Sequence, residues 1–522
     1  MNAQRTPPPE RYNFAQDLLA RNAARGAKAA YVDDAGSLTY AELETRVRAA
    51  AAAYLALGVR REERVLLCLQ DSVDFPIAFL GALFAGIVPV AVNTLLTAED
   101  YAYMLAHSRA NAVIVSGAVL PVMNKALGLG EHGVKHVIVS RATAALPENA
   151  TDFAAWSMSA GAMSTAVDTA ADAMAFWLYS SGSTGRPKGT VHTHANLHWT
   201  AELYGAPVLG IGPSDVVFSA AKLFFAYGLG NALTFPLGVG ATTILMAERA
   251  TPQAVFARLK QHRPTIFCGV PTLYAAMLSS PELPERADVA LRRCISAGEA
   301  LPREVGEKFA ARFGCEILDG IGSTEMLHIF LSNLPGKVRY GTTGQPVPGY
   351  DIELRGEDGR AVGVDVIGDL FIRGPSAALM YWESRERARA TFQGEWTKSG
   401  DKYTLDADGY YTYAGRSDDM LKVSGQYVSP FEVEGALMRH EAVQEAAVVG
   451  KIGDDGLTRT LAYVVLKSGR TGDAALAQAL QVFVKDQLAP YKYPREIRFL
   501  PELPKTATGK IQRFKLREGA AR

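Results

Sequence analysis

The sequence has 522 residues, and its 54 lysine and arginine residues balance 54 aspartate and glutamate residues. At about 150 residues per domain, this length predicts two to four domains and a sizeable buried core. Nucleic acids and anionic membrane surfaces bind clustered positive charge, so a net charge of zero argues against both as partners. Small ligands that are recognised locally fit this composition better.

The four cysteines lie far apart in the sequence and form no CxxC pair, so a disulfide framework or a zinc site has little support. We expect buried thiols in a reducing compartment. The N-terminal segment lacks the apolar stretch of a signal peptide, which favours the cytoplasm. The uncharged stretch from Phe75 to Ala98 is long enough for a membrane span. Because Gly86 and Pro89 interrupt it, we predict a buried helix and a short strand instead.

The elements predicted along the chain alternate between helices and strands. Thr39 and Glu42 form a capping-box pattern at the start of an alanine-rich helix that extends towards Leu57. A buried strand follows at residues 64–70. This alternation predicts an α/β protein of mostly parallel sheets with helices on both faces. Further short apolar runs, each a predicted strand, lie at residues 112–116, 136–140, 241–246, 265–270 and 292–298.

Two changes in composition mark joints in the chain. Residues 157–173 are small, polar and aperiodic, and they precede a predicted strand at residues 174–179. The second joint lies near residue 416, and the segment after it carries helices and strands of its own. We therefore predict a large N-terminal domain at residues 1–416 and a small mobile α+β domain at residues 417–522.

A loop rich in glycine and hydroxyl side chains follows the strand at residues 174–179. Its sequence, YSSGSTGRPKGT, suits a phosphate group: glycines expose backbone N–H groups, hydroxyls donate hydrogen bonds, and Lys188 adds positive charge. Pro187 precedes the lysine and Gly189 follows it, so the loop is not a Walker A loop. By composition alone, such a loop is more often a flexible surface turn.

The order of these residues resembles the adenylate-forming superfamily of acyl-CoA synthetases, luciferases and peptide-synthetase adenylation domains. Further motifs of the superfamily follow in the right order over nearly the whole chain. They are LFAGIVPVAVN before the loop, then SAGEALP (296–302), DGIGSTE (319–325), GDLFIRGPSAALMYW (368–382), WTKSGD (396–401), GRSDDMLKVSGQYVSP (415–430), LAPYKYP (488–494) and PKTATGKIQR (504–513).

The resemblance implies a site for ATP. It implies that Thr324 binds phosphate and that Glu325 coordinates Mg²⁺, a hard cation that suits carboxylate oxygens. It places Asp401 on the ribose and Arg416 on the ribose or a phosphate, although each, taken alone, fits half of a surface ion pair equally well. The predicted nucleotide-binding residues are Ser181, Gly182, Ser183, Thr184, Gly185, Lys188, Gly298, Glu299, Ala300, Asp319, Gly320, Thr324, Asp401 and Arg416.

The resemblance also implies two steps with different domain arrangements. Lys510, with Thr324 and Glu325, is the predicted catalytic group, and it contacts the acid's carboxylate and the α-phosphate as acyl-AMP forms. The C-terminal domain then rotates about a hinge at Asp418. This rotation brings the loop of Gly425 to the site, where the missing side chain leaves room for the pantetheine of coenzyme A.

Within the superfamily the chain most resembles the benzoate-CoA ligases, through residues 222–237 and the motifs SAGEALP and DGIGSTEMLHIF. No carrier-protein motif follows Lys510, and we expect the enzyme to act alone. The likeness implies a compact pocket for a flat aromatic acid. Its predicted lining residues are Ala226, Tyr227, Gly298, His328, Ile329, Lys422 and Lys510.

Several roles and substrates stay open. His328 either donates to the carboxylate or packs beneath it, and Lys422 either approaches the carboxylate or stays a solvated charge. Benzoate is the first predicted acid; hydroxybenzoate, cinnamate and medium-chain acids are alternatives. Loading of a separate carrier protein is a further alternative. A nucleotide-binding module without chemistry is another, and the presence of Lys188, Thr324, Glu325, Asp401 and Lys510 argues against it. A homodimer and acetylation of Lys510 are also left open.

Overall fold

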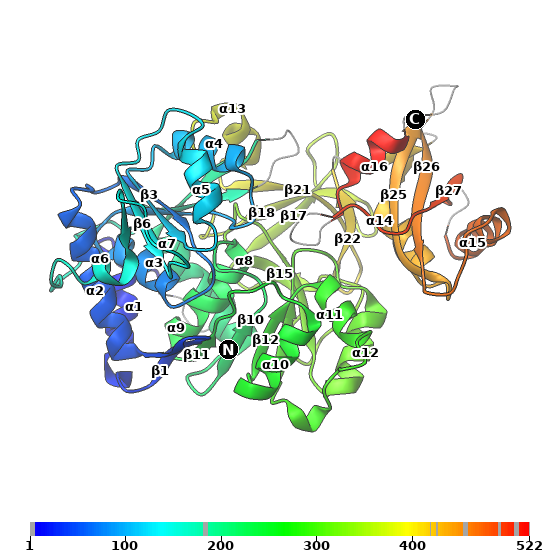
Figure 1. The fold of residues 1–522 in the computed structure, drawn as a ribbon. Helices are drawn as coiled ribbons and strands as arrows, with labels where there is room; N and C mark the ends of the chain where they lie inside the picture. The colour runs from blue at the N-terminus through cyan, green and yellow to red at the C-terminus, as the bar shows by residue number, and fades with distance from the viewer. Residues whose placement is uncertain are drawn as a thin grey trace. The chain divides into compact units, whose positions relative to one another are not determined.

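The computed structural model describes residues 6–180, 186–417, 419–423, 426–452, 458–488, 492–505 and 511–520. The chain forms two compact units, residues 1–352 with 372–398 and residues 353–371 with 399–522. The strands β17 (Asp351–Arg355), β18 (Gly368–Arg373) and β21 (Trp396–Leu405) carry the chain across this division (Figure 1). The predicted boundary after residue 416 falls within the second unit, and as a point of domain movement it stays a prediction.

The first unit contains an eight-stranded sheet whose central strands are parallel. Its strands include the predicted apolar runs at residues 64–70, 112–116, 136–140 and 174–179, which confirms them. In sheet order the strands are β19 (Met380–Tyr381), β9 (Lys188–Thr193), β8 (Met174–Ser180), β4 (Val88–Ala91), β3 (Arg64–Cys68), β5 (Ala112–Ser116), β6 (His136–Ser140) and β7 (Ala150–Asp152).

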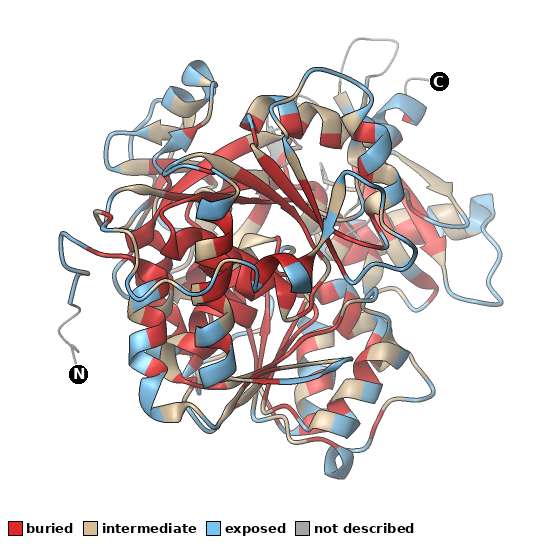
Figure 2. Ribbon diagram, turned by 60° about the vertical axis from the view of Figure 1, so that its left-hand side comes forward, coloured by how far each residue is buried: buried red, intermediate tan, exposed pale blue. Residues whose placement is uncertain are grey.

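Both faces of this sheet are buried, as a parallel sheet requires. Along β3, Val65 and Leu67 join one apolar core, whereas Leu66 and Cys68 join another on the opposite face. Figure 2 shows buried residues running along the strands and the inner sides of the helices. The first core includes α1 (Phe14–Asn22), α2 (Tyr40–Ala56), α3 (Asp74–Phe84) and α6 (Phe153–Ser157), and the second includes α4 (Ala98–Ser108) and α5 (Leu120–Leu127).

A nine-stranded sheet forms the other half of the first unit. Its strands are parallel from β1 to β14, and the edge strands β2, β15 and β16 are antiparallel. The strands β11, β12 and β13 confirm the remaining predicted runs. In sheet order the strands are β16 (Gln345–Pro346), β15 (Ile329–Ser332), β14 (Ile317–Gly322), β13 (Arg293–Ser296), β12 (Ile266–Gly269), β10 (Val216–Ser219), β11 (Thr242–Ile244), β1 (Ala29–Asp33) and β2 (Gly36–Thr39).

Helices connect and cover the strands of this sheet, as predicted for an α/β protein. The core on one face includes residues of α10, α11 and α12. The remaining elements of the first unit are short. The helices are α7 (His194–Thr200), η2 (Ala201–Leu209), α8 (Ala226–Leu229), η3 (Gly230–Thr234), α9 (Phe235–Val239), α10 (Pro252–His262), α11 (Pro271–Leu278), α12 (Arg303–Phe313), α13 (Arg385–Thr391), η1 (Ala23–Arg25) and η4 (Arg286–Asp288), and the last strand is β20 (Phe392–Gln393).

The local predictions at the N-terminal side are confirmed. Thr39 Oγ1 accepts the N–H of Glu42, and the Glu42 carboxylate accepts the N–H of Thr39, so the capping box begins α2. The uncharged stretch forms the fully buried helix α3 and the buried strand β4. Among the described residues, no helix is long and apolar enough to cross a membrane. All four cysteines are buried thiols.

The second unit is an α+β arrangement, as predicted for the C-terminal part. Within it β22 pairs with the end of β21, and a buried Glu434 accepts the N–H of Val448 at 2.7 Å and an Arg513 N–H at 2.7 Å. These bonds connect α14, β25 and α16. The elements are β22 (Tyr411–Arg416), β23 (Leu421–Val423), β24 (Gln426–Val428), α14 (Pro430–Met438), β25 (Val443–Ile452), β26 (Thr458–Leu466), α15 (Ala474–Gln487), β27 (Glu496–Phe499) and α16 (Arg513–Ala520).

The close packing of α2 on α3 depends on Gly81. A Cβ there would lie 2.9 Å from Ala50 Cβ and 3.3 Å from Val47 O. Overpacking costs about 1–3 kcal/mol, more than the helix preference for alanine returns, so Gly81→Ala should lower the free energy of unfolding. Gly238→Ala is the matched control, because its Cβ would meet Ala201 Cβ at an ordinary 3.5 Å. Equal stability of the two variants in thermal unfolding would contradict this packing.

Candidate nucleotide and acid site

Predicted site residues of the first unit follow the carboxyl ends of parallel strands, where open α/β sheets bind ligands. Thr324 and Glu325 follow β14, Gly298 follows β13, and β10 leads through a short loop into α8, which carries Tyr227. Gly298 has φ +95°, and no atom lies within 4 Å of a Cβ built there. The positive φ favours glycine at this position, and the space beside it at the strand ends is open.

Lys188, the first residue of β9, lies beside Glu325 and Tyr381. Its Nζ is 3.9 Å from Glu325 Oε1 and donates to the Tyr381 hydroxyl at 3.1 Å. The Tyr381 hydroxyl donates to Glu325 Oε1 at 2.7 Å, and the Lys188 ammonium lies 4.3 Å from the centre of the Tyr381 ring. The Lys188 and Glu325 side chains are only 19% and 15% exposed. The structure thus brings two predicted phosphate-site residues together.

The backbone around Glu325 is held by hydrogen bonds from other segments. His192 Nε2 is 2.7 Å from Thr324 O, and the Ala378 N–H donates to Glu325 O at 2.8 Å. His192 and Ala378 belong to β9 and to the segment before β19. The backbone carbonyls of Thr324 and Glu325 therefore already have hydrogen-bond partners without a ligand, and this holds the predicted phosphate-binding side chain of Thr324 in place.

Glu325 is the one predicted metal ligand. Among the described residues, no cluster of three or more His, Cys, Asp or Glu side chains could hold a metal ion by itself. Mg²⁺ usually binds one or two carboxylates together with phosphate and water oxygens. A single carboxylate at the predicted phosphate site fits Mg²⁺ that arrives with a nucleotide.

His328 is buried among aromatic rings. Its ring centre lies 4.5 Å from that of Phe235, 5.6 Å from that of Tyr204 and 5.7 Å from that of Tyr227. Its Nε2 is 3.3 Å from Tyr227 O, and burial lowers the pKa of His328 to about 3. A Cβ at Gly230 would lie 2.2 Å from His328 Cδ2, so glycine is needed there. At neutral pH His328 is therefore an uncharged ring.

Buried polar atoms without a hydrogen-bond partner in the described part of the chain gather near Tyr227. They include both amide atoms of Asn231, Ser296 Oγ, Asp319 Oδ1 and His328 Nδ1. Ser296 and Asp319 are register neighbours on β13 and β14. Burial raises the pKa of Tyr227. The Asp319 carboxyl group raises this pKa further, and the Asn231 side chain lowers it.

These unpartnered atoms indicate a place for polar ligand atoms or water, because at least about 90% of buried polar groups in proteins have a partner. Burial raises the pKa of Asp319 to about 8, so this carboxyl group keeps its proton at neutral pH. The sequence predicted Asp319 as a nucleotide-binding residue but gave no role to Asn231. A lone amide inside the apolar run GLGNALTFPL is the signal that could have found it.

Five further predicted residues belong to the strands and turns described above, and their roles stay predictions. Ile329, the first residue of β15, is buried and pairs with Gly322 of β14. A Cβ at the predicted residue Gly320, also on β14, would lie 3.0 Å from Ile329 Cγ2. Glu299 and Ala300 are partly exposed and continue the turn that Gly298 begins. Ala226 is half-buried at the start of α8.

In the second unit the structure pairs the two predicted ribose-contacting residues. Asp401 and Arg416 are opposite each other on β21 and β22, and Arg416 Nη1 lies 3.4 Å from Asp401 Oδ1. The Asp401 side chain is mostly buried, whereas the Arg416 side chain is 47% exposed. The ion pair that the sequence left open therefore exists, and the contact with a ribose stays a prediction.

Several predicted residues lie outside the described residues. They are the loop residues Ser181, Gly182, Ser183, Thr184 and Gly185, the hinge Asp418, Gly425 and the catalytic Lys510. The side chain of Lys422 is also outside them.

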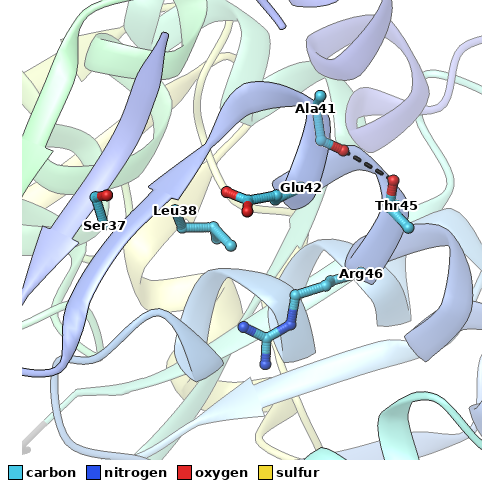
Figure 3. A pocket seen from close by; sticks show the side chains of 6 residues that line it. All are labelled: Ser37, Leu38, Ala41, Glu42, Thr45 and Arg46. Carbon is cyan, nitrogen blue, oxygen red and sulfur yellow. Dashed lines mark hydrogen bonds between the residues drawn. The ribbon is translucent and has the colours of Figure 1, made fainter. Parts of the chain in front are cut away.

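A separate shallow pocket lies on β2 and α2 (Figure 3). Within it Thr45 Oγ1 donates to Ala41 O at 2.9 Å, and Glu42 belongs to the capping box of α2. None of the predicted site residues lines it, and its polar groups serve the helix start. The lining residues are Ser37, Leu38, Ala41, Glu42, Thr45 and Arg46.

Comparison with known proteins places this site in a family. Residues 19–382 match the model of the AMP-binding enzyme family, and residues 432–510 match the AMP-binding enzyme C-terminal domain. The chain belongs to the AMP-binding enzyme family.

Several similar proteins align with this chain over nearly its full length. The chain is 57% identical to a benzoate–CoA ligase of Thauera aromatica over 98% of both chains. It is 48% identical to a 4-hydroxybenzoate–CoA/benzoate–CoA ligase of Rhodopseudomonas palustris, over 97% of this chain and 94% of that protein. A crystal structure of a benzoate CoA ligase from Burkholderia xenovorans superposes with a TM-score of 0.91 at 62% identity, covering 97% of this chain and 100% of that one.

A solved anthranilate CoA ligase in complex with anthranoyl-AMP is also similar, with a TM-score of 0.92 at 40% identity over 98% of each chain. The α/β architecture is thus shared with these enzymes over almost their full length.

Two buried histidines of the first unit should make the fold sensitive to acid. Burial lowers the pKa of His194 to about 4 and that of His328 to about 3, against 6.5 in an unfolded chain. At these two positions the unfolded state therefore binds more protons below pH 6.5, and the histidines' contribution to stability is lost as the pH falls, whereas Asp319, whose pKa burial raises, contributes in the opposite direction. At pH 5 each histidine should cost about 2 kcal/mol. Denaturant unfolding between pH 7 and 5 measures the slope, and His328→Gln should reduce it; an unchanged slope would refute this origin.

Proposed function

We propose that this enzyme is an ATP-dependent benzoate–CoA ligase. The supporting observation is the contact of Lys188, Tyr381 and Glu325 at the strand ends, in the same unit as a buried aromatic site around His328. The full-length relatives named as benzoate–CoA ligases agree with this assignment. An anionic, flat acid and a nucleotide phosphate are the ligands that this combination suits.

The reaction proceeds in two steps. A carboxylate oxygen of the acid attacks the α-phosphorus of ATP, pyrophosphate leaves with the electron pair of the broken P–O bond, and acyl-AMP forms. The sulfur of coenzyme A then attacks the acyl carbon, the thiol proton is lost, and AMP leaves. The acid itself is the first nucleophile, so no catalytic serine or cysteine is needed.

The chain's own residues stabilise charge in the first step. Lys188 offers its ammonium to the phosphates, and Thr324 precedes Glu325 on the loop whose backbone is already hydrogen-bonded to other segments. Glu325 would hold Mg²⁺, which would supply positive charge to neutralise the phosphates. Lys510 contacts the carboxylate and the α-phosphate in this proposal, and its positive charge offsets the negative charge that develops between them.

The acid lies against an apolar and aromatic surface. His328 is neutral at physiological pH, so it contributes an uncharged ring and a hydrogen-bonding nitrogen rather than a counter-charge. Attraction of the acid's carboxylate is then left to Lys510 and Lys422. Because one methylene in an apolar pocket changes binding by about 1–3 kcal/mol, the pocket selects by fit, and close ring analogues react more slowly.

Domain alternation completes the proposal. The C-terminal domain rotates about Asp418 between the two steps, which withdraws Lys510 and presents the loop of Gly425 to coenzyme A. A location in the cytoplasm, a homodimer and acetylation of Lys510 stay predictions.

Product analysis tests the reaction. Incubation with benzoate, ATP, Mg²⁺ and coenzyme A should yield AMP, pyrophosphate and benzoyl-CoA in equal amounts. Catalytic efficiency across benzoate, hydroxybenzoates, cinnamate and a medium-chain acid should be highest for benzoate. Formation of ADP, or thioester on a carrier protein but not on coenzyme A, would contradict the proposal.

The role of Lys510 has a separate test. Lys510→Ala should lose acyl-AMP formation, whereas conversion of supplied benzoyl-AMP to the thioester should persist, because the lysine acts only in the first step. Pyrophosphate release and thioester formation are measured separately. Equal loss in both half-reactions would overturn the assignment.

A further inference from the structure

A buried carboxylate holds the loop that leads into α8. Asp71 follows β3 in the eight-stranded sheet and is 2% exposed. Its Oδ1 accepts the N–H of Leu223 at 3.0 Å. Leu223 belongs to the loop between β10 and α8, at the carboxyl end of the nine-stranded sheet. One hydrogen bond therefore connects the segments that follow a strand in each sheet.

Lys222 anchors the same loop from its other side. Its Nζ donates to the carbonyl of Met246 and, at 2.7 Å, to Glu248 O, both of which follow β11. Burial lowers the pKa of Lys222, and the charge of Asp71 raises it. Asp71 thus holds the loop at the backbone N–H of Leu223, and the neighbouring Lys222 ties the loop to the carbonyls of the segment after β11.

The loop and the first turn of α8 are closely packed and joined by hydrogen bonds. Lys222 O accepts the N–H of Phe225 at 3.0 Å, and Phe225 O accepts the N–H of Leu229 at 2.7 Å. A Cβ at Gly228 would lie 2.0 Å from Lys222 O. A shift of the Leu223 backbone should therefore also shift the first turn of α8.

The helix α8 carries Tyr227 across two strand ends. The Tyr227 hydroxyl donates to Gly269 O and to Ile295 O, each at 3.1 Å, and its backbone carbonyl lies beside His328 Nε2. This geometry places the ring at the carboxyl ends of β12 and β13. The position of the ring depends on where α8 begins.

Folding disfavours the ionised form of Asp71 relative to its protonated form. Burial raises its pKa to about 6, and Lys222 and the Leu223 N–H lower it. Because this value lies above the 3.8 of an unfolded aspartate, the folded state binds the proton more tightly, and stability is lost as the pH rises from 3.8 through 6. Keeping the Asp71 carboxylate buried and ionised therefore costs stability at neutral pH, and a role other than stability would explain its presence.

We propose that Asp71 is a positioning residue for the acid: by holding Leu223, with Lys222 beside it, it fixes α8 and the Tyr227 ring in the acyl pocket. This inference rests on the proposed function, since it assumes that Tyr227 lines the site of the acid. Asp71 acts through the loop and touches no substrate.

Asp71→Asn tests this role, because asparagine keeps the shape and removes the charge. Because the charge-assisted hydrogen bond to Leu223 becomes a weaker neutral one, the KM for benzoate should rise about tenfold, with the KM for ATP unchanged. Lys222→Met should give a similar shift, and the double variant should lose less than the sum of the two. Equal rises of both KM values would overturn the inference.

Asp215→Asn is the matched control. Asp215 is also buried and its Oδ2 accepts a backbone N–H, that of Gly212 at 2.8 Å, but it precedes β10 and pairs with Arg292. This variant should lose stability while its KM for benzoate stays that of the parent. Asp71→Asn should unfold no earlier than Asp215→Asn. The reverse pattern would assign Asp71 a structural role only.

The pH profile gives a second readout. The titratable groups that face Asp71 are Lys222 and, from β1, Tyr31; Glu248, Arg258 and Asp34 face Lys222. As the pH falls through about 6, Asp71 gains a proton and the parent's KM for benzoate should rise. Asp71→Asn should have a high KM without this rise. The same slope in both proteins would overturn the inference.

Hydrogen exchange separates this inference from the proposed function. The amides of residues 220–229 should exchange faster in Asp71→Asn than in the parent and in Asp215→Asn, with or without substrates. Unchanged exchange, or an unchanged KM in an active enzyme, would overturn the inference alone. A parent enzyme that converts no aromatic acid would overturn the proposed function and the role of α8 with it.

Discussion

The contact of Lys188 with Glu325 through the Tyr381 hydroxyl is the interaction on which the first unit depends. Lys188 and Tyr381 belong to neighbouring strands at the edge of the eight-stranded sheet, and Glu325 follows β14 of the nine-stranded sheet. The contact therefore joins the two sheets where their strands end. Because both charged side chains are largely shielded from water, their attraction is screened less than that of an exposed pair. It concentrates one positive and one negative group at a single point.

Burial also determines the charge around the predicted acid site, but there it favours the neutral forms of the side chains. His328 is neutral because burial disfavours its charged form, and Asp319 keeps its proton for the same reason. Under the proposed function, a benzoate carboxylate in this region would meet no fixed negative charge from Asp319. Asp71 remains ionised at neutral pH because Lys222 and a backbone N–H face it, although its burial raises its pKa to about 6. The first unit thus separates the charged residues of the predicted phosphate site from the neutral residues of the predicted acid site.

The sequence predicted the elements well where local pattern determines them. The buried strands at residues 112–116 and 136–140 have bounds identical to the apolar runs, because a parallel strand with two buried faces must be apolar throughout. The contacts between distant segments were not predictable in this way. Tyr381 lies in a recognised motif, yet nothing in its residue type indicates that its hydroxyl bridges Glu325 and Lys188. Asp71 was missed because its partner, Leu223, is 152 residues away.

The balance of 54 basic and 54 acidic residues also takes on a physical meaning. A protein that binds ATP and coenzyme A has to attract several negative charges, and a broad basic surface would do so without selecting among anions. Among the described residues, Lys188 is paired with Glu325 and Arg416 with Asp401, so both of these predicted nucleotide contacts have an acidic neighbour. Under the proposed function, an incoming phosphate would compete with that neighbour for the positive charge. If Mg²⁺ bound Glu325 as proposed, it would release Lys188, and recognition of the anion would then depend on the metal.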